Sequence, residues 1–113
     1  MLVLEPIKVG NLELKNRFVM VPMGAELGNF DPRTVDYYVT RAKGGASMVM
    51  TTVIATEAID GHTPASTLTE ESFAGFKELV DRSHEFDCKI CLQVVPGIGL
   101  GGIGEGRVKP ASA

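Results

Sequence analysis

The sequence predicts an α/β fold built around a parallel β-sheet. Three short, continuously apolar runs alternate with two segments that have amphipathic helical spacing. Runs that are apolar on both faces are typical of strands in a parallel sheet that helices cover. The runs start about 30 and then about 42 residues apart, which is enough for a right-handed helical crossover between successive parallel strands.

Length and composition limit the class of protein. The 113 residues suffice for one small domain, and 44% hydrophobic with 22% charged residues excludes disorder and collagen-like sequence. The net charge of −3 argues against a nucleic-acid or anionic-membrane partner. The sequence contains neither an apolar run of membrane-spanning length nor a secretory signal at its start. We therefore expect a cytoplasmic protein with no nucleic-acid and no membrane partner.

The first elements are a β-hairpin over 4–15 and a strand over 18–22. Apolar and polar residues alternate on both sides of Gly10 and Asn11, the pattern of a two-residue hairpin turn. The apolar strand that follows ends at Pro22, because proline cannot donate to a β-ladder.

A helix is predicted over 32–43. Asp31 is a suitable N-cap, and Pro32 occupies the first helical position. Glycines at 44 and 45 end the helix. One apolar stripe at i, i+3, i+4 and i+7 predicts the buried face: Val35, Tyr38, Val39 and Ala42.

The remaining predicted elements are a strand over 47–54, a helix over 69–86 and a strand over 89–95. The second helix follows a capping-box pattern, Thr67-Leu68-Thr69-Glu70. The third strand stops at Pro96. The predicted buried stripe of the second helix consists of Phe73, Phe76, Leu79 and Val80.

A sheet of three strands that are apolar on both faces needs further strands and helices to cover it. The sequence ends in a glycine-rich segment without supplying them. We therefore expect either the N-terminal part of a larger fold or a chain that completes its sheet with a partner, including a second copy of itself.

Two motifs suggest other functions. Gly97–Gly102 matches G-x-G-x-x-G, which would indicate a Rossmann-type nucleotide binder, but no amphipathic helix follows it. Cys88 and Cys91 form C-x-x-C, yet positions i and i+3 of a strand point to opposite faces, so small buried residues are expected rather than a metal or redox site. His62 and His84 are expected at the surface.

The carboxyl ends of the strands are the expected ligand-binding edge, because ligands of parallel α/β folds bind there. The first strand ends in Val21-Pro22-Met23-Gly24, and the second passes through Val53. Gln93 interrupts the apolar third strand. A buried glutamine without hydrogen-bond partners costs about 1–3 kcal/mol, so its amide should meet either backbone groups or a ligand.

Taken together, these segments resemble the old yellow enzyme family of flavin-dependent oxidoreductases, and most of all its NADH:flavin oxidoreductase and 2,4-dienoyl-CoA reductase branch. The stretches that carry the resemblance are residues 4–17, 21–24 and 37–46, the strand with Gln93, and residues 106–107 and 110–113. The resemblance implies that the chain, over 1–113, is the N-terminal portion of a (β/α)8 TIM barrel, with its hairpin and about three βα units. The whole barrel requires ~250 residues.

The resemblance also implies FMN as the cofactor and NADH or NADPH as the electron donor. Val21, Pro22, Met23 and Gly24 would lie along the flavin, Val53 would approach its ring, and Gln93 would hydrogen-bond its pyrimidine edge. The complete enzyme would reduce activated C=C bonds of small unsaturated carbonyl compounds such as enones, enoates or enoyl-CoA.

The chain also departs from the family pattern. Val94-Val95-Pro96-Gly97 follows the glutamine where the family often has a histidine, and position 24 is glycine rather than cysteine or threonine. No catalytic residue and no metal ligand is expected within the chain, and a 4Fe-4S cluster would belong to a missing C-terminal part. The chain alone is expected to be catalytically incomplete.

Overall fold

The computed structural model describes residues 1–23, 30–55 and 69–95. In this part of the chain a short 3-10 helix, Leu2–Leu4, precedes an antiparallel hairpin of strands β1 (Ile7–Val9) and β2 (Leu12–Leu14). Gly10 has φ +58° in the two-residue turn, whereas Asn11 does not have a positive φ. A positive φ at the first central residue alone is the pattern of a type II′ turn.

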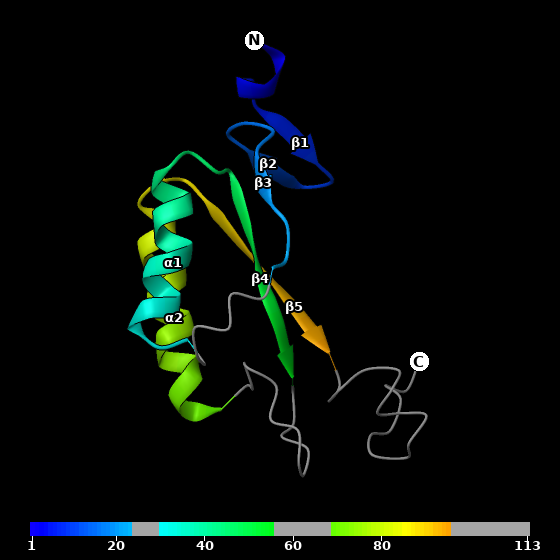
Figure 1. Cartoon of the computed structure of the whole chain (residues 1–113). Helices are drawn as coiled ribbons and strands as arrows, with labels where there is room; N and C mark the ends of the chain where they lie inside the picture. Colours follow the sequence, from blue (N-terminus) through cyan, green and yellow to red (C-terminus); the bar gives the residue numbers. More distant parts are fainter. Residues whose placement is uncertain (24–29, 56–68, 96–113) are drawn as a thin grey trace.

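A three-stranded parallel sheet follows, in the order β3-β4-β5 (Figure 1). Its strands are β3 (Val19–Met20), β4 (Met48–Ala55) and β5 (Lys89–Val95). Strand β3 is shorter than the predicted 18–22 because only two of its residues pair with β4. Both strands that flank β4 are edge strands among the described residues.

The crossovers between the strands are helices α1 (Pro32–Lys43) and α2 (Glu70–His84), which lie on the same side of the sheet (Figure 1). Helix α1 begins where its sequence predicts, since the Asp31 side chain accepts a hydrogen bond from the Thr34 N–H at 2.9 Å. This bond lowers the pKa of the Asp31 carboxyl, because it stabilises the carboxylate.

The start of α2 differs from the prediction. The N-cap is Thr69, whose hydroxyl accepts from the Ser72 N–H while the Ser72 hydroxyl accepts from the Thr69 N–H. The capping box is therefore Thr69–Ser72 rather than Thr67–Glu70, because serine as well as glutamate can return the second hydrogen bond. Helix α2 ends at His84, two residues before the predicted end.

The hydrophobic core lies between the two helices and one face of the sheet. All four residues of the predicted α1 stripe are buried in it. On α2, Leu79 is fully buried but Phe73 is 61% exposed, which corrects its prediction as a core residue. Phe73 lies in the first turn of α2, which projects beyond the amino end of α1 (Figure 1). The core residues are Phe30, Val35, Tyr38, Val39, Ala42, Val49, Ile54, Leu79 and Cys88.

Hydrogen bonds tie the three strands together at their amino ends. The Ser47 N–H and hydroxyl both donate to the Phe18 carbonyl, at 2.9 and 2.8 Å, and the Lys89 N–H donates to the Ser47 carbonyl at 2.9 Å. The Asn16 amide donates to the Gly45 carbonyl at 2.8 Å and accepts from the Phe18 N–H. These bonds fix the relative positions at which the strands begin, and hence where their carboxyl ends lie.

Candidate functional site

Val53 and Gln93 lie side by side at the carboxyl end of the sheet. The parallel register pairs Val53 of β4 with Gln93 of β5. Paired residues of adjacent strands project to the same face, and both side chains are exposed, Val53 to 39%. Because α1 and α2 cover the opposite face, these two side chains lie on the face that the helices leave open (Figure 1).

A β-bulge in β4 precedes this pair. The register advances from Met50 to Val53 on β4 but only from Cys91 to Gln93 on β5. Two residues, Thr51 and Thr52, therefore lie opposite the single residue Leu92. The bulge changes which face each later residue of β4 occupies.

The burial of the β4 side chains shows this change. Val49 and Thr51 are fully buried on the helix-covered face. In a regular strand Val53 would also face the helices and Ile54 would face away, because successive side chains alternate. Instead Ile54 is buried and Val53 is exposed. The bulge therefore brings Val53 to the same face as Gln93.

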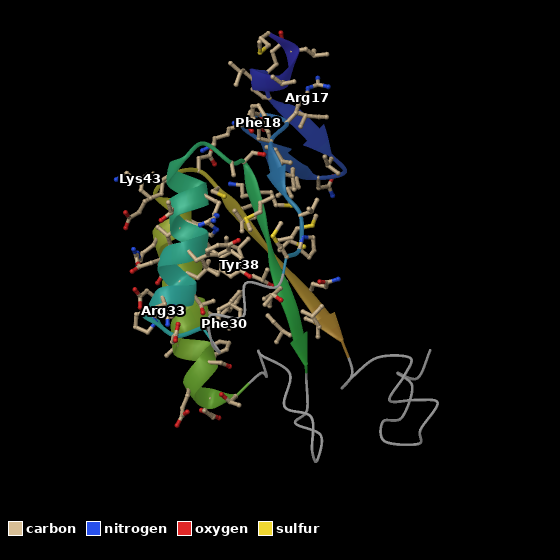
Figure 2. All side chains as sticks on the ribbon, in the orientation of Figure 1. Arg17, Phe18, Phe30, Arg33, Tyr38 and Lys43 are labelled. Carbon is tan, nitrogen blue, oxygen red and sulfur yellow. The ribbon has the colours of Figure 1, made fainter. Side chains whose placement is uncertain are left out.

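Tyr38 of α1 contacts the bulge directly. Its hydroxyl accepts a hydrogen bond from the Thr52 backbone N–H at 2.7 Å. Figure 2 shows the Tyr38 side chain projecting from α1 toward β4. The side chain is only 1% exposed, and burial raises the pKa of its hydroxyl, so this group is neutral at physiological pH.

The sequence pattern predicts Tyr38 as a buried residue of the apolar α1 stripe, without a role in the site. The available signal was the residue type, since a buried tyrosine, unlike phenylalanine, brings a hydroxyl that needs a hydrogen-bond partner.

Val21, Pro22 and Met23 follow β3 and are all exposed. Met20 is paired with Val49, and from there residues 21–23 continue in the direction in which β4 runs (Figure 1). This segment therefore runs toward the carboxyl edge of the sheet. Gly24, the fourth residue predicted in this segment, lies outside the described residues.

The environment of Gln93 differs from the prediction. Its side chain is exposed rather than buried, because β5 is an edge strand and no helix covers this face. None of the described residues forms a hydrogen bond with its amide. The donor and acceptor of the Gln93 side chain are therefore free to bind another molecule.

A hollow of about 570 Å³ lies at the opposite end of the sheet. It is lined by residues of the N-terminal segment, β3, the end of α1 and the turn before β4. None of the predicted site residues contributes to it. Its principal polar side chains are already engaged, since Asn16 bonds to Gly45 and the Arg41 guanidinium stacks on the Tyr37 ring at 3.5 Å. The hollow is therefore not the candidate site.

Within the described residues, the two cysteines and His84 add no chemistry to this edge. Cys88 is buried and Cys91 half-buried, and both are free thiols. No group of potential metal ligands occurs within residues 1–23, 30–55 and 69–95. His84 is exposed in the last turn of α2. His62 and the glycine-rich segment 97–106 lie outside the described residues, so the predictions made for them stay predictions. No helix in the described part of the chain is long and apolar enough to cross a membrane.

The profile of the NADH:flavin oxidoreductase / NADH oxidase family matches residues 3–102. The chain belongs to this family. The family match spans the sheet, both helices and every predicted site residue, so the resemblance noted from the short motifs is confirmed.

Relatives within the family are reductases and oxidases. The chain is 37% identical over 107 residues to the cinnamate reductase of Clostridium sporogenes, covering 84% of this chain and 16% of the relative. It is 35% identical over 94 residues to the NADH oxidase of Thermoanaerobacter brockii, covering 77% of this chain and 14% of the relative. The chain thus spans about a sixth of the length of these relatives.

The fold is shared with solved old yellow enzymes. The Old Yellow Enzyme of Pichia sp. AKU4542 superimposes with a TM-score of 0.71 over 84% of this chain and 26% of that chain, at 24% identity. A 2-naphthoyl-CoA reductase superimposes with a TM-score of 0.68 over 82% of this chain and 15% of that chain, at 25% identity. The chain therefore forms part of a TIM barrel.

Proposed function

We propose that this chain supplies one side of the FMN site in an NAD(P)H-dependent oxidoreductase that reduces activated C=C bonds. The observation that carries the proposal is the pairing of Val53 with Gln93 on the open face of the sheet, at its carboxyl edge. Ligands of TIM barrels bind at this edge. Membership of a flavin oxidoreductase family makes FMN the cofactor to test first.

The exposed residues suit the two kinds of surface on a flavin. The pyrimidine edge of the isoalloxazine carries amide-like donors and acceptors, and a carboxamide such as that of Gln93 offers one of each. The flat ring needs apolar contacts, which Val21, Met23 and Val53 offer as exposed aliphatic side chains. In this assignment Pro22 and Gly24 complete the segment along the ring.

Bound FMN would supply hydride transfer between NADH or NADPH and an unsaturated carbonyl substrate. The contribution of this chain is to bind and orient the cofactor through the Gln93 amide and the apolar residues beside it. The phosphate-binding groups, the proton donor and the groups that hold the substrate are assigned to the rest of the barrel. The same holds for any iron–sulfur cluster.

The test uses a completed barrel, in which this chain replaces the matching segment of the Thermoanaerobacter brockii NADH oxidase. We expect this protein to be purified with the visible absorption of a bound flavin. Gln93→Leu keeps the side-chain size but removes the amide, and we expect the Kd for FMN to rise by about tenfold or more, since a lost hydrogen bond leaves a polar group unpaired.

The matched control is Asn11→Ser, which replaces an exposed amide in the β1–β2 turn and should leave the Kd unchanged. A folded completed barrel that lacks flavin, or a Gln93→Leu variant that binds FMN as tightly as the parent protein, would contradict the proposal.

A second candidate is self-association without catalysis. It is favoured by the two edge strands, β3 and β5, whose outer backbone groups have no strand partner among the described residues. Light scattering on the isolated chain distinguishes the two candidates. A defined oligomer that excludes FMN supports self-association, whereas FMN binding in the completed barrel supports the flavin site.

A further inference from the structure

We infer that Tyr38 is a positioning residue for the candidate site: its hydroxyl holds the β4 bulge that places Val53 on the same face as Gln93. This inference rests on the proposed function for its consequence in flavin binding. It assigns a site role to a residue on the opposite side of the sheet from the site itself.

The first step of the argument concerns the backbone of the bulge. A bulge leaves one residue out of the regular ladder, and a buried backbone N–H that lacks an acceptor is costly. The Thr52 N–H donates to the Tyr38 hydroxyl at 2.7 Å. The Thr51 hydroxyl donates to the Thr52 carbonyl at 3.1 Å, so both polar groups of the Thr52 backbone have partners from side chains.

The second step concerns how firmly Tyr38 is held. Its ring is fully buried and packs edge-on against Tyr37, with centroids 5.2 Å apart and the planes at 78°. Helix α1 is capped at Asp31, and its buried stripe shares one core with Leu79 of α2. The hydroxyl is therefore a fixed acceptor rather than one that must be ordered when the bulge forms.

The third step links the bulge to the site. Removing the extra residue from the pairing would restore strict alternation, so that Val53 would turn toward the helices and Ile54 toward the open face. Ile54 is fully buried in the core and Val53 is paired with Gln93. The hydrogen bond from Thr52 to Tyr38 thus favours the register that the candidate site requires.

Tyr38→Phe tests this inference, because it keeps the buried ring and removes only the hydroxyl. In the 113-residue chain, NMR should show the Thr52 amide protected from hydrogen exchange, and a nuclear Overhauser contact between the Val53 methyls and the Gln93 side chain. In Tyr38→Phe we expect exchange at Thr52 to accelerate at least tenfold relative to the Val35 amide in α1, and the Val53–Gln93 contact to weaken.

Two controls separate positioning from general stability. Tyr37→Phe removes a neighbouring half-buried tyrosine hydroxyl and should change neither signal. Leu79→Val lowers the stability of the core away from the bulge, and should accelerate exchange at Thr52 and Val35 by the same factor.

The same variants in the completed barrel connect the bulge to the flavin. We expect Tyr38→Phe to raise the Kd for FMN several-fold and to shift the flavin absorption maximum, whereas Tyr37→Phe and Leu79→Val should leave both unchanged. A completed barrel that binds no FMN, with the NMR changes still present, would remove the proposed function but leave Tyr38 as the residue that holds the bulge.

Three results would overturn the inference. One is a Thr52 amide that is unprotected in the parent chain. Another is a Tyr38→Phe variant that matches the parent in two signals: the rate of exchange at Thr52 relative to Val35, and the Val53–Gln93 contact. The third is a Tyr38→Phe barrel that binds FMN with an unchanged Kd and spectrum.

Discussion

The carbonyl group of Phe30 occupies the space that a side chain at position 75 would need. A Cβ placed on Gly75 would lie far closer than 3.0 Å to the Phe30 oxygen, and 3.1 Å from the Phe30 Cβ. Phe30 itself has φ +54° and is buried, with its ring edge-on to Phe76 at 5.7 Å. Figure 2 shows Phe30 at α2, just before α1 begins. The residue that leads into α1 is therefore held in its strained conformation by α2.

We expect Gly75→Ala to destabilise the chain by about 1–3 kcal/mol, because the new methyl group forces Phe30 away from α2. The sign of this stability change is informative, since replacing glycine by alanine within an unobstructed helix usually stabilises the helix by up to about 1 kcal/mol. Urea unfolding followed by circular dichroism measures the effect.

Ala74→Gly, at the preceding exposed position, is the control for intrinsic helix propensity. A Gly75→Ala variant that is more stable than the parent chain would show that Phe30 does not approach α2 this closely.

The capping box of α2 gives a second prediction. Removing the Thr69 hydroxyl leaves the Ser72 N–H without its acceptor, so Thr69→Ala should cost about 1 kcal/mol of unfolding free energy. Thr40→Ala is the control, because the Thr40 hydroxyl donates to a carbonyl within the exposed part of α1. If Thr67→Ala destabilised the chain more than Thr69→Ala, the predicted Thr67–Glu70 box would be the correct one.

Local signals in the sequence predict much of the fold. Helix α1 is predicted at its observed bounds because Asp31, Pro32 and the glycines at 44 and 45 act through the backbone next to them. The hairpin turn at Gly10 and the end of β5 before Pro96 are likewise predicted by residues at those positions. The same kind of local pattern predicts Phe73 in the core, whereas its side chain is 61% exposed. The burial of a side chain depends on which elements pack against it, and the local pattern does not contain that information.

The site was predicted less completely, for a physical reason. The positions of Val53 and Gln93 near the strand ends follow from the sequence, but their pairing depends on the bulge at Thr51 and Thr52. Two adjacent threonines suit a regular strand as well as a bulge, so residue type carries no signal there. The partner that stabilises the bulge, Tyr38, is separated from it by 14 residues along the chain.

The two cysteines should differ in reactivity. Burial raises the pKa of the Cys88 thiol above its ordinary value of 9.0, so less thiolate is present at a given pH. In single-cysteine variants, we expect Cys91 in Cys88→Ala to react with a disulfide reagent near neutral pH at least about tenfold faster than Cys88 in Cys91→Ala. Equal rates in folded protein would contradict the burial of Cys88.

The same shift predicts the alkaline behaviour of the chain. A thiol whose pKa is raised by folding leaves stability unaffected below the pKa of the unfolded chain, and stability falls as the pH rises through and above about 9. We expect this loss to be smaller in Cys88→Ala than in Cys91→Ala when unfolding is followed between neutral pH and pH values above the ordinary thiol pKa. If the unfolding free energy falls with pH equally in the two variants, ionisation of Cys88 is not the cause of the loss.

Arg82 of α2 forms an exposed ion pair with Asp36 of α1 at 2.8 Å and a second one with Glu78 of its own helix at 3.0 Å. These contacts raise the pKa of the Arg82 guanidinium, but solvent screens them. A double-mutant cycle of Arg82→Ala and Asp36→Ala should therefore give a coupling below about 1 kcal/mol that shrinks with added salt. A larger coupling, insensitive to salt, would mean that the pair is shielded from water.

The number of strands in the described sheet limits what copies of this chain can build. Copies that join edge to edge, with β5 of one against β3 of the next, add strands three at a time. A TIM barrel closes with eight strands, and eight is not a multiple of three. No ring made only of this three-stranded sheet reproduces that closure, so a barrel of eight strands needs five strands beyond those of the described sheet.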